Sequence, residues 1–282
     1  MSIDLAAPSG HVVSPDGTRI GWFREGPARP EDAASDPGAP PVVLVHGTTA
    51  DHQTWRVLGP MLAARGPVVS IDRRGRGGSG DAEPYGIERE FEDVAAVAAA
   101  LAAVHGSPAD VIGHSFGGRC ALGAATVASE SIRRVVTYEG AVSAHVGAAD
   151  LARLETLEAE RRWPELLEVF LREVVDMTDE EWQRFLSAPV YPDRVAAAHT
   201  VVREIRAGGE EAAAWSGYGA VRQPVLQILG SDSPPFFVAG AEALDELLPD
   251  GRLAVIDGAR HAAHHTHPGA MFDLIASFLD RP

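Results

Sequence analysis

The sequence predicts an α/β protein in which a parallel β-sheet carries helices on both faces. Short apolar runs look like strands buried on both faces, because their residues do not alternate between apolar and polar. These runs are residues 42–46, 67–72, 110–115, 133–139, 225–229 and 253–257. Helical patterns separate them, beginning after residues 91, 117 and 236 and again in the last segment. Strands and helices that alternate at this spacing favour parallel pairing.

The alternating part of the chain is preceded by a predicted hairpin and a loop. Residues 11–24 contain two short β-like runs around Pro15-Asp16-Gly17. This tripeptide is a turn signal, because glycine accepts positive φ and aspartate bonds its own backbone. Residues 25–40 are polar and rich in Pro, Gly and Ala without periodicity, which indicates a surface loop.

One long interval breaks the alternation. Between Glu139 and Val225 no segment has a convincing strand pattern, whereas several have helical periodicity. Thr178 and Glu181 have the spacing of a capping box, which marks the start of a helix. The interval therefore predicts a helical insertion.

The insertion suggests how the chain is organised. We expect residues 1–140 and 220–282 to form the core domain and residues 141–219 to form a helical cap. Ligands of parallel α/β sheets bind at the carboxyl ends of the strands. An insertion at that edge would lie over the site as a lid.

Charge and composition exclude several classes of partner. The chain has 40 acidic against 24 basic residues, and its formal charge of -16 repels nucleic-acid phosphates and anionic membrane surfaces. No apolar stretch reaches membrane-spanning length, the first residues do not resemble a signal peptide, and Cys120 is the only cysteine. We expect a cytoplasmic protein that acts on a small molecule and binds neither nucleic acid nor membrane. The oligomeric state stays open, a homodimer included.

Residues 113–117 read Gly-His-Ser-Phe-Gly, the pattern G-x-S-x-G. This pattern indicates a nucleophile elbow only where a strand precedes it and a helix follows, and both flanks of Ser115 match. Gly113 and Gly117 suit such an elbow, since a side chain there would collide with a neighbouring element. The alternative is a glycine-rich junction with an inert serine. We predict that Ser115 is a nucleophile.

A nucleophilic serine requires a base, and His261 is the best placed candidate. It follows the last predicted strand and precedes the final helix, where it can reach a serine on a central strand. His264, His265 and His267 crowd the same segment, so we also considered a metal site. The spacing matches no known ligand pattern and no carboxylate lies among them. We expect no metal, and assign these three to loop or lid contacts.

Backbone N–H groups are the expected donors to an oxyanion. The first buried run leads into His46-Gly47-Thr48, where glycine lets the backbone turn over the site. We predict that the N–H groups of Thr48 and Phe116 form the oxyanion hole. Alone, this pattern would also fit a simple turn from strand to loop.

Together these motifs resemble the α/β-hydrolase superfamily over nearly the whole chain outside the insertion. They are VLVHGTT (43–49), DRRGRGGSG (72–80), GHSFGG (113–118), LGSDS (229–233) and GARH (258–261). The resemblance implies an eight-stranded, mostly parallel sheet, a nucleophile-histidine-acid triad and a helical cap between strands 6 and 7. Serine at the nucleophile position points away from dehalogenases and epoxide hydrolases. It leaves serine-type hydrolases.

The acid is where the sequence departs from the family pattern. Many members have Asp three residues after the glycine that ends strand 7, but this chain has Ser233 there and Asp232 one residue early. A second position used in the family is the end of strand 6, where this chain has Glu139. A carboxylate at the exit of a buried strand needs a partner. We prefer Glu139 and keep Asp232 as the alternative.

The predicted function is a cofactor-free serine hydrolase that acts on an ester-like, thioester-like or activated carbonyl of a small, largely apolar molecule. Part of the aromatic side chains of the insertion and of the strand 7 exit should line its pocket, namely Trp163, Trp182, Trp215 and Phe236. The same residues could serve a C–C bond hydrolase, a lyase or a cyclase. A non-catalytic small-molecule receptor is the alternative from another class.

Overall fold

The computed structural model describes residues 7–26, 39–140, 146–209 and 215–281. Its strands form one eight-stranded sheet in the order β1-β2-β4-β3-β5-β6-β7-β8. They are β1 (Gly10–Val13), β2 (Arg19–Arg24), β3 (Val42–Val45), β4 (Val68–Ile71), β5 (Ala109–His114), β6 (Ile132–Tyr138), β7 (Val225–Gly230) and β8 (Gly251–Ile256). β2 pairs antiparallel with β1 and β4, and the other pairs are parallel. The predicted mostly parallel sheet and its opening hairpin are confirmed.

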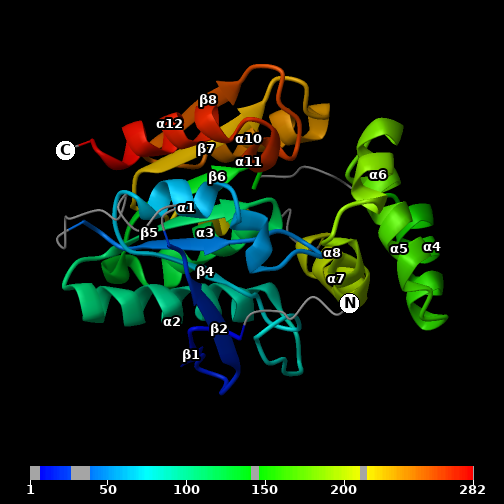
Figure 1. The fold of residues 1–282 in the computed structure, drawn as a ribbon, viewed down its shortest axis with the longest axis horizontal. Helices are drawn as coiled ribbons and strands as arrows, with labels where there is room; N and C mark the ends of the chain where they lie inside the picture. Colours follow the sequence, from blue (N-terminus) through cyan, green and yellow to red (C-terminus); the bar gives the residue numbers. More distant parts are fainter. Residues whose placement is uncertain (1–6, 27–38, 141–145, 210–214, 282) are drawn as a thin grey trace.

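Helices cover both faces of this sheet (Figure 1). α2 (Ile87–His105) and α3 (Phe116–Val127) pack on one face, while α1 (Leu58–Ala63) and α12 (Pro268–Leu279) pack on the other. The side chains of β3 alternate between the two, because Val43 and Val45 join the first apolar cluster and Val42 and Leu44 join the second. Both faces of the strand are therefore apolar, which explains its unbroken run of hydrophobic residues.

Inserted helices occupy the interval between β6 and β7 and lie mainly at one end of the molecule in Figure 1. They are α4 (Ala148–Ala159), α5 (Trp163–Val169), α6 (Asp179–Leu186), α7 (Tyr191–Ala196), α8 (Val201–Gly209) and α9 (Trp215–Tyr218). They have an apolar cluster of their own, which includes Leu154, Leu166 and Val201. The predicted capping box is present, since the Thr178 hydroxyl accepts from the Glu181 N–H while the Glu181 carboxylate accepts from the Thr178 N–H.

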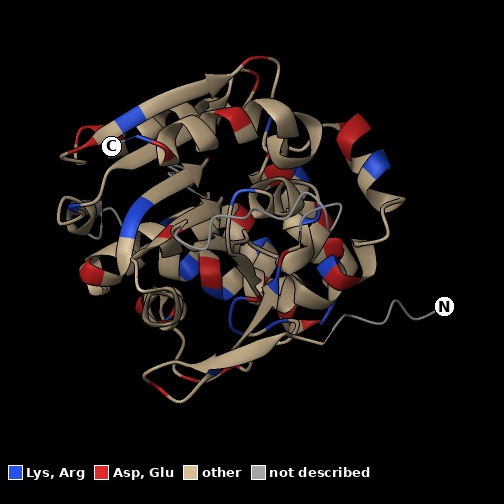
Figure 2. Ribbon diagram, turned by 60° about the vertical axis from the view of Figure 1, so that its left-hand side comes forward, with Lys and Arg blue, Asp and Glu red and all other residues tan. Residues whose placement is uncertain are grey.

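Helix α8 is joined to the core by buried ion pairs. Arg73 lies 2.7 Å from a carboxylate oxygen of Glu90 in α2 and 3.1 Å from one of Glu204 in α8. Arg76 also pairs with Glu204. Burial alone would raise the pKa of Glu204, but these two arginines lower it to about 2. Figure 2 shows basic and acidic segments close together in this middle part of the molecule.

Among the helices that the structure describes, none has the length and apolar character to cross a membrane. The longest, α2, has 19 residues and carries three charged side chains within its first turn, Glu88, Arg89 and Glu90. Glu90 turns inward to Arg73, so this helix belongs to the fold of the core.

We predict that Glu204→Ala lowers the free energy of unfolding by about 3 to 5 kcal/mol, because it leaves two buried arginines without this partner. Urea denaturation measures the change. Because the folded pKa is depressed, the stabilisation is present above pH 4.5 and is lost as the pH falls toward about 2. Glu155→Ala is the control, since Glu155 pairs with Arg206 on the surface. It should cost less than about 1 kcal/mol; equal losses would contradict the prediction.

Candidate active site

Ser115 lies on a sharp turn between β5 and α3. Its φ of 54° and ψ of −129° lie in a region that non-glycine residues rarely adopt. Of the described residues, five other than glycine have positive φ, and four of them, Thr49, Ser115, Glu139 and Asp176, belong to the segments that form this site or line its cavity. Strained backbone concentrates where it positions functional groups. The turn also sets Ser115 at the N-terminus of α3, whose positive end favours an anion nearby.

Glycines make this turn sterically feasible. A Cβ atom at Gly113 would lie 2.3 Å from the carbonyl oxygen of Gly117, and one at Gly117 would lie 2.3 Å from that of Val45. A Cβ atom at Gly47 would lie 2.9 Å from the Ser115 Cβ. These distances are shorter than any real carbon contact, so the predicted reason for the two glycines of the motif is confirmed.

His261 is held by a buried carboxylate. Its Nδ1 lies 2.5 Å from Glu139 Oε2, and the Glu139 side chain has no exposed surface. Glu139 Oε1 also accepts from the Gly230 N–H at 2.9 Å and from the Ser233 hydroxyl. Since a carboxylate only accepts, Nδ1 carries the proton and Nε2 is left as a base. The ring of Phe237 stacks on the imidazole at 4.5 Å and helps to fix its plane.

The second candidate acid lies elsewhere. Asp232 is exposed, and its carboxylate accepts from the Ser231 hydroxyl at 2.9 Å. Its backbone carbonyl accepts from Arg260. Of the two acids that the sequence left open, the structure places Glu139 against His261. The serine at the family's usual aspartate position, Ser233, donates to Glu139.

His46 orients the loop that carries Thr48. Its Nδ1–H donates to the Gly47 carbonyl at 2.8 Å, and its Nε2 accepts from the Arg73 N–H at 3.0 Å. Burial and the nearby Arg76 and Arg73 lower the pKa of His46 well below its usual value, so the ring is neutral. In a trans peptide the carbonyl and the following N–H point in opposite directions. The Thr48 N–H therefore points away from His46.

Phe116 supplies the second predicted donor. It is the first residue of α3, so its N–H has no acceptor within the helix. Its ring is buried, and the guanidinium of Arg73 lies 4.5 Å above it. The side chain therefore points into the core and not toward the solvent. Only the backbone of Phe116 can then serve the site, as an oxyanion donor would.

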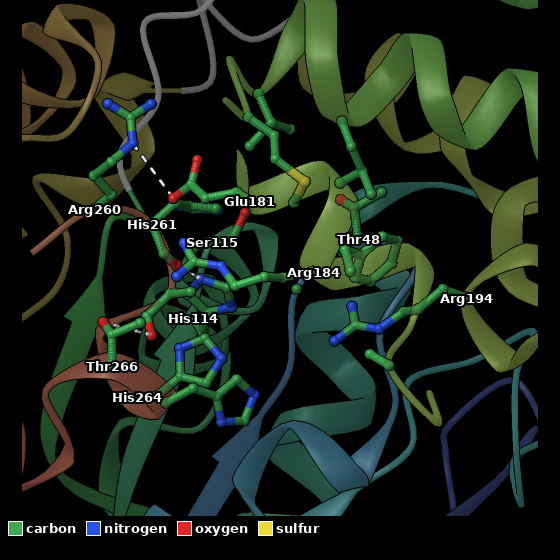
Figure 3. A pocket seen from close by; sticks show the side chains of 18 of the residues that line it. Thr48, His114, Ser115, Glu181, Arg184, Arg194, Arg260, His261, His264 and Thr266 are labelled. Atoms are coloured by element: carbon green, nitrogen blue, oxygen red, sulfur yellow. Dashed lines mark hydrogen bonds and ion pairs between the residues drawn. The ribbon is translucent and has the colours of Figure 1, made fainter. Parts of the chain in front are cut away.

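Ser115, His261 and Thr48 line one cavity of about 320 Å³ (Figure 3). One part of the lining is apolar and comes from the inserted segment; it includes Phe170, Leu171, Val175, Met177, Phe185 and Val190. The other part is polar and includes Arg56, Arg194, His114, His264, His265 and Thr266. The cavity therefore has an apolar side and a basic side around the serine.

Of the aromatic side chains expected in the pocket, Trp163, Trp182 and Phe236 are absent from this lining. Trp182 is buried, 4% exposed, and packs against Phe185 with ring centroids 5.7 Å apart. Trp163 packs against the apolar cluster of the inserted helices, and Phe236 packs on Phe237 at 4.5 Å. Trp163 and Trp182 therefore help to fill the interior of the insertion, whereas Phe236 packs in the core beside β7. The side chain of Trp215 lies outside the described residues.

The structure adds His114 to the histidines near His261: its ring lies beside those of His261 and His264, and the His265 ring lies beside that of His264. His114 donates from Nε2 to the His261 carbonyl at 2.9 Å, and its ring lies 4.5 Å from those of His261 and His264. Burial lowers the pKa of His114 and of His264 well below the usual value. Burial together with Arg56 and Arg194 lowers the pKa of His265 to about 4. Nowhere in the described ranges do three metal-ligating side chains form a metal-binding group.

The sequence profile of the alpha/beta hydrolase family matches residues 42–274. The chain belongs to this family. It is 29% identical to 2-succinyl-6-hydroxy-2,4-cyclohexadiene-1-carboxylate synthase of Salmonella paratyphi C, over 86% of this chain and 95% of that protein. It is 26% identical to N-formylmaleamate deformylase of Pseudomonas putida, over 86% and 89% of the two chains. An alpha/beta hydrolase from Sphaerobacter thermophilus superposes with a TM-score of 0.78 at 29% identity, covering 95% and 99%.

Family membership confirms the predicted superfamily, and with it the prediction that the chain is an enzyme of the hydrolase type. The eight-stranded, mostly parallel sheet is the fold that the superfamily resemblance implied. The motifs behind that prediction lie at the ends of β3, β4, β5, β7 and β8, and segments after β3, β5, β7 and β8 line the cavity.

We predict that Gly117→Ala prevents folding or costs several kcal/mol, because the new Cβ would overlap the Val45 carbonyl and the strand cannot shift. Gly269→Ala is the control, since nothing lies within 4 Å of its added Cβ and alanine favours the helix by up to ~1 kcal/mol. Thermal unfolding compares the two. A Gly117→Ala protein as stable as the Gly269→Ala protein would refute the steric argument.

Proposed function

We propose that this enzyme is a serine hydrolase that cleaves an ester-like, thioester-like or activated carbonyl of a small molecule through an acyl-enzyme. The observation that carries the proposal is the set of contacts around His261. A buried carboxylate fixes its Nδ1, and its ring lines the same cavity as a serine on a strained elbow. Nucleophile, base and orienting group are then all provided, as acyl transfer requires.

In the proposed reaction Ser115 Oγ attacks the carbonyl carbon while His261 Nε2 takes the hydroxyl proton. The carbonyl oxygen becomes an oxyanion and accepts from the N–H groups of Thr48 and Phe116. When the tetrahedral species collapses, the imidazolium gives its proton to the leaving group. Water then attacks the acyl-enzyme with His261 again as the base. No step requires a cofactor.

Glu139 stabilises the imidazolium that forms in both half-reactions. Its carboxylate lies in a site without solvent exposure, where an ionic hydrogen bond is strong. The Gly230 N–H and the Ser233 hydroxyl occupy the other oxygen, so the carboxylate cannot rotate away from the imidazole. We propose Glu139, and not Asp232, as the acid of the triad.

We propose that residues 141–219 act as a cap that selects the substrate, on a core of residues 1–140 and 220–282. Apolar side chains of this segment, among them Phe170, Val175 and Phe185, line the cavity that contains Ser115. Side chains of this kind bind apolar parts of a ligand and exclude water from the reacting carbonyl.

A second candidate is C–C bond chemistry, a lyase or a cyclase at the same site. It is supported by the relative named a synthase, which is 29% identical over 86% of this chain. The proposed triad could take a proton from carbon as well as from Ser115. Product analysis by mass spectrometry separates the two, because only ester hydrolysis releases an alcohol or thiol together with an acid.

We predict that Ser115→Ala and His261→Ala each lower kcat by roughly 10³-fold or more while the fold is kept. The double variant should be little worse than either, because the two residues act as a unit. Hydrolysis of simple esters and labelling of Ser115 by a fluorophosphonate measure this. Tight ligand binding without labelling would instead favour a receptor.

The two candidate acids give opposite expectations. Glu139→Gln should lower kcat by about 10⁴-fold, the loss known for the buried acid of trypsin, because the histidine tautomer and the imidazolium lose their partner. Asp232→Asn should change kcat by less than about two-fold, since this carboxylate is exposed and contacts Ser231. Steady-state rates at neutral pH decide between them. The reverse ranking would exclude Glu139.

A further inference from the structure

The arginines of the cavity differ in whether a carboxylate neutralises them. Arg260 lies 3.4 Å from Glu181 and 3.6 Å from Asp176, and Arg184 lies 3.6 Å from Glu180. All three contacts are ordinary ion pairs near the surface. The positive charges of Arg260 and Arg184 are therefore already neutralised without a ligand.

Arg194 and Arg56 have no such partner among the described residues. Arg194 donates to the Thr54 hydroxyl at 3.4 Å, and Arg56 donates to the Gln53 carbonyl and to His265 Nε2. No carboxylate of the described segments lies within 4.0 Å of either guanidinium. Acidic residues outnumber basic ones by 40 to 24 in this chain. A shortage of carboxylates therefore does not explain why Arg194 and Arg56 have no carboxylate partner.

The surroundings of Arg194 make its charge costly. Burial lowers its pKa to about 10, and Arg56 acts in the same direction, against the more distant Asp51. At neutral pH the group is still a cation. A partly buried cation without a paired anion is unfavourable, so the position of Arg194 in the cavity wall favours an anionic ligand.

We propose that the substrate carries a carboxylate in its acyl part, and that Arg194, with Arg56 beside it, binds this group while Ser115 attacks the ester carbonyl. The proposal rests on the serine hydrolase function. The planar guanidinium binds carboxylates through two parallel hydrogen bonds, which fixes orientation as well as charge. The apolar side of the cavity, which includes Phe170 and Val190, would hold the carbon chain between the two ends.

The positions of the side chains agree with this assignment. In Figure 3 the Arg194 side chain extends into the cavity on the side of Thr48, across Ser115 from the paired Arg260. Arg56 donates to His265 Nε2, so the proton of this neutral histidine is on Nδ1. That Nδ1 is buried and has no acceptor in the described parts of the chain. A carboxylate at this end would therefore meet a third donor.

The test compares esters of matched chain length. Monoethyl succinate, glutarate and adipate carry the carboxylate, whereas ethyl butanoate, pentanoate and hexanoate do not. We expect kcat/KM to be at least about 10-fold higher for one or more of the half-esters than for its uncharged counterpart. Arg194→Gln should lower kcat/KM for that half-ester by roughly 10- to 100-fold, as the loss of one ionic hydrogen bond does, and leave the uncharged ester within about two-fold.

Arg153→Gln is the matched control. It removes the same charge from the inserted helices, but Arg153 lies on the surface and pairs with Glu173. It should leave both substrate sets within about two-fold of the parent. An equal loss with this variant would show a long-range effect of charge and overturn the assignment to Arg194. The melting temperature of Arg194→Gln should be unchanged or higher, because a partly buried unpaired charge is removed.

Binding of the free diacids decides the matter independently of turnover. In Ser115→Ala, calorimetric titration with succinate, glutarate and adipate should show binding that Arg194→Gln weakens by 10-fold or more. No difference between the two backgrounds, or inorganic phosphate binding as tightly as the best diacid, would overturn the carboxylate proposal. If uncharged esters are cleaved and Ser115→Ala abolishes the reaction, the hydrolase function stands even where this proposal fails.

Discussion

The site depends on one buried carboxylate that cannot be left without donors. Glu139 directly follows β6 with a φ of 48°, and its side chain is fully buried. Its hydrogen bonds come from Gly230 at the end of β7, from Ser233 in the next loop and from His261 in the loop after β8. A buried carboxylate that lost these donors would cost several kcal/mol. The three segments are therefore fixed around β6, which also pairs with the strand that leads to Ser115.

A second buried carboxylate, that of Glu204, also joins several segments near the site. Glu204 belongs to the inserted helix α8, yet its partners Arg73 and Arg76 follow β4 in the core. The backbone N–H of Arg73 also donates to His46 Nε2, at the start of the loop that carries Thr48. The loop that carries the proposed oxyanion donor and the helices above the cavity are thus anchored to one charge cluster. A displacement of α8 would disturb that loop as well.

The sequence predicted those parts of the site that follow from local rules. The strands were evident from apolar runs, and Ser115, His261 and Glu139 were predicted as site residues because each lies at or just after the end of such a run. The short helix α1 was not predicted, since six residues that include Pro60 show no helical period. Trp182 was expected in the pocket, but a large apolar side chain suits the interior of the insertion equally well. Whether Arg194 is paired depends on which carboxylates the fold brings near, and no sequence spacing gives that.

An unpaired arginine also changes how a cavity discriminates between ligands. An apolar wall distinguishes two substrates that differ by one methylene only weakly, by about 10- to 200-fold. When a site has a buried polar group that needs a hydrogen-bonding or ionic partner from the ligand, it rejects a ligand without that partner far more strongly. An uncharged chain lying against Arg194 would deepen the burial of the cation, whereas a carboxylate would compensate it. Arg194 lies near Arg56 with no carboxylate in contact, which makes the folded state less stable. The same unpaired charge would make the cavity selective for carboxylates.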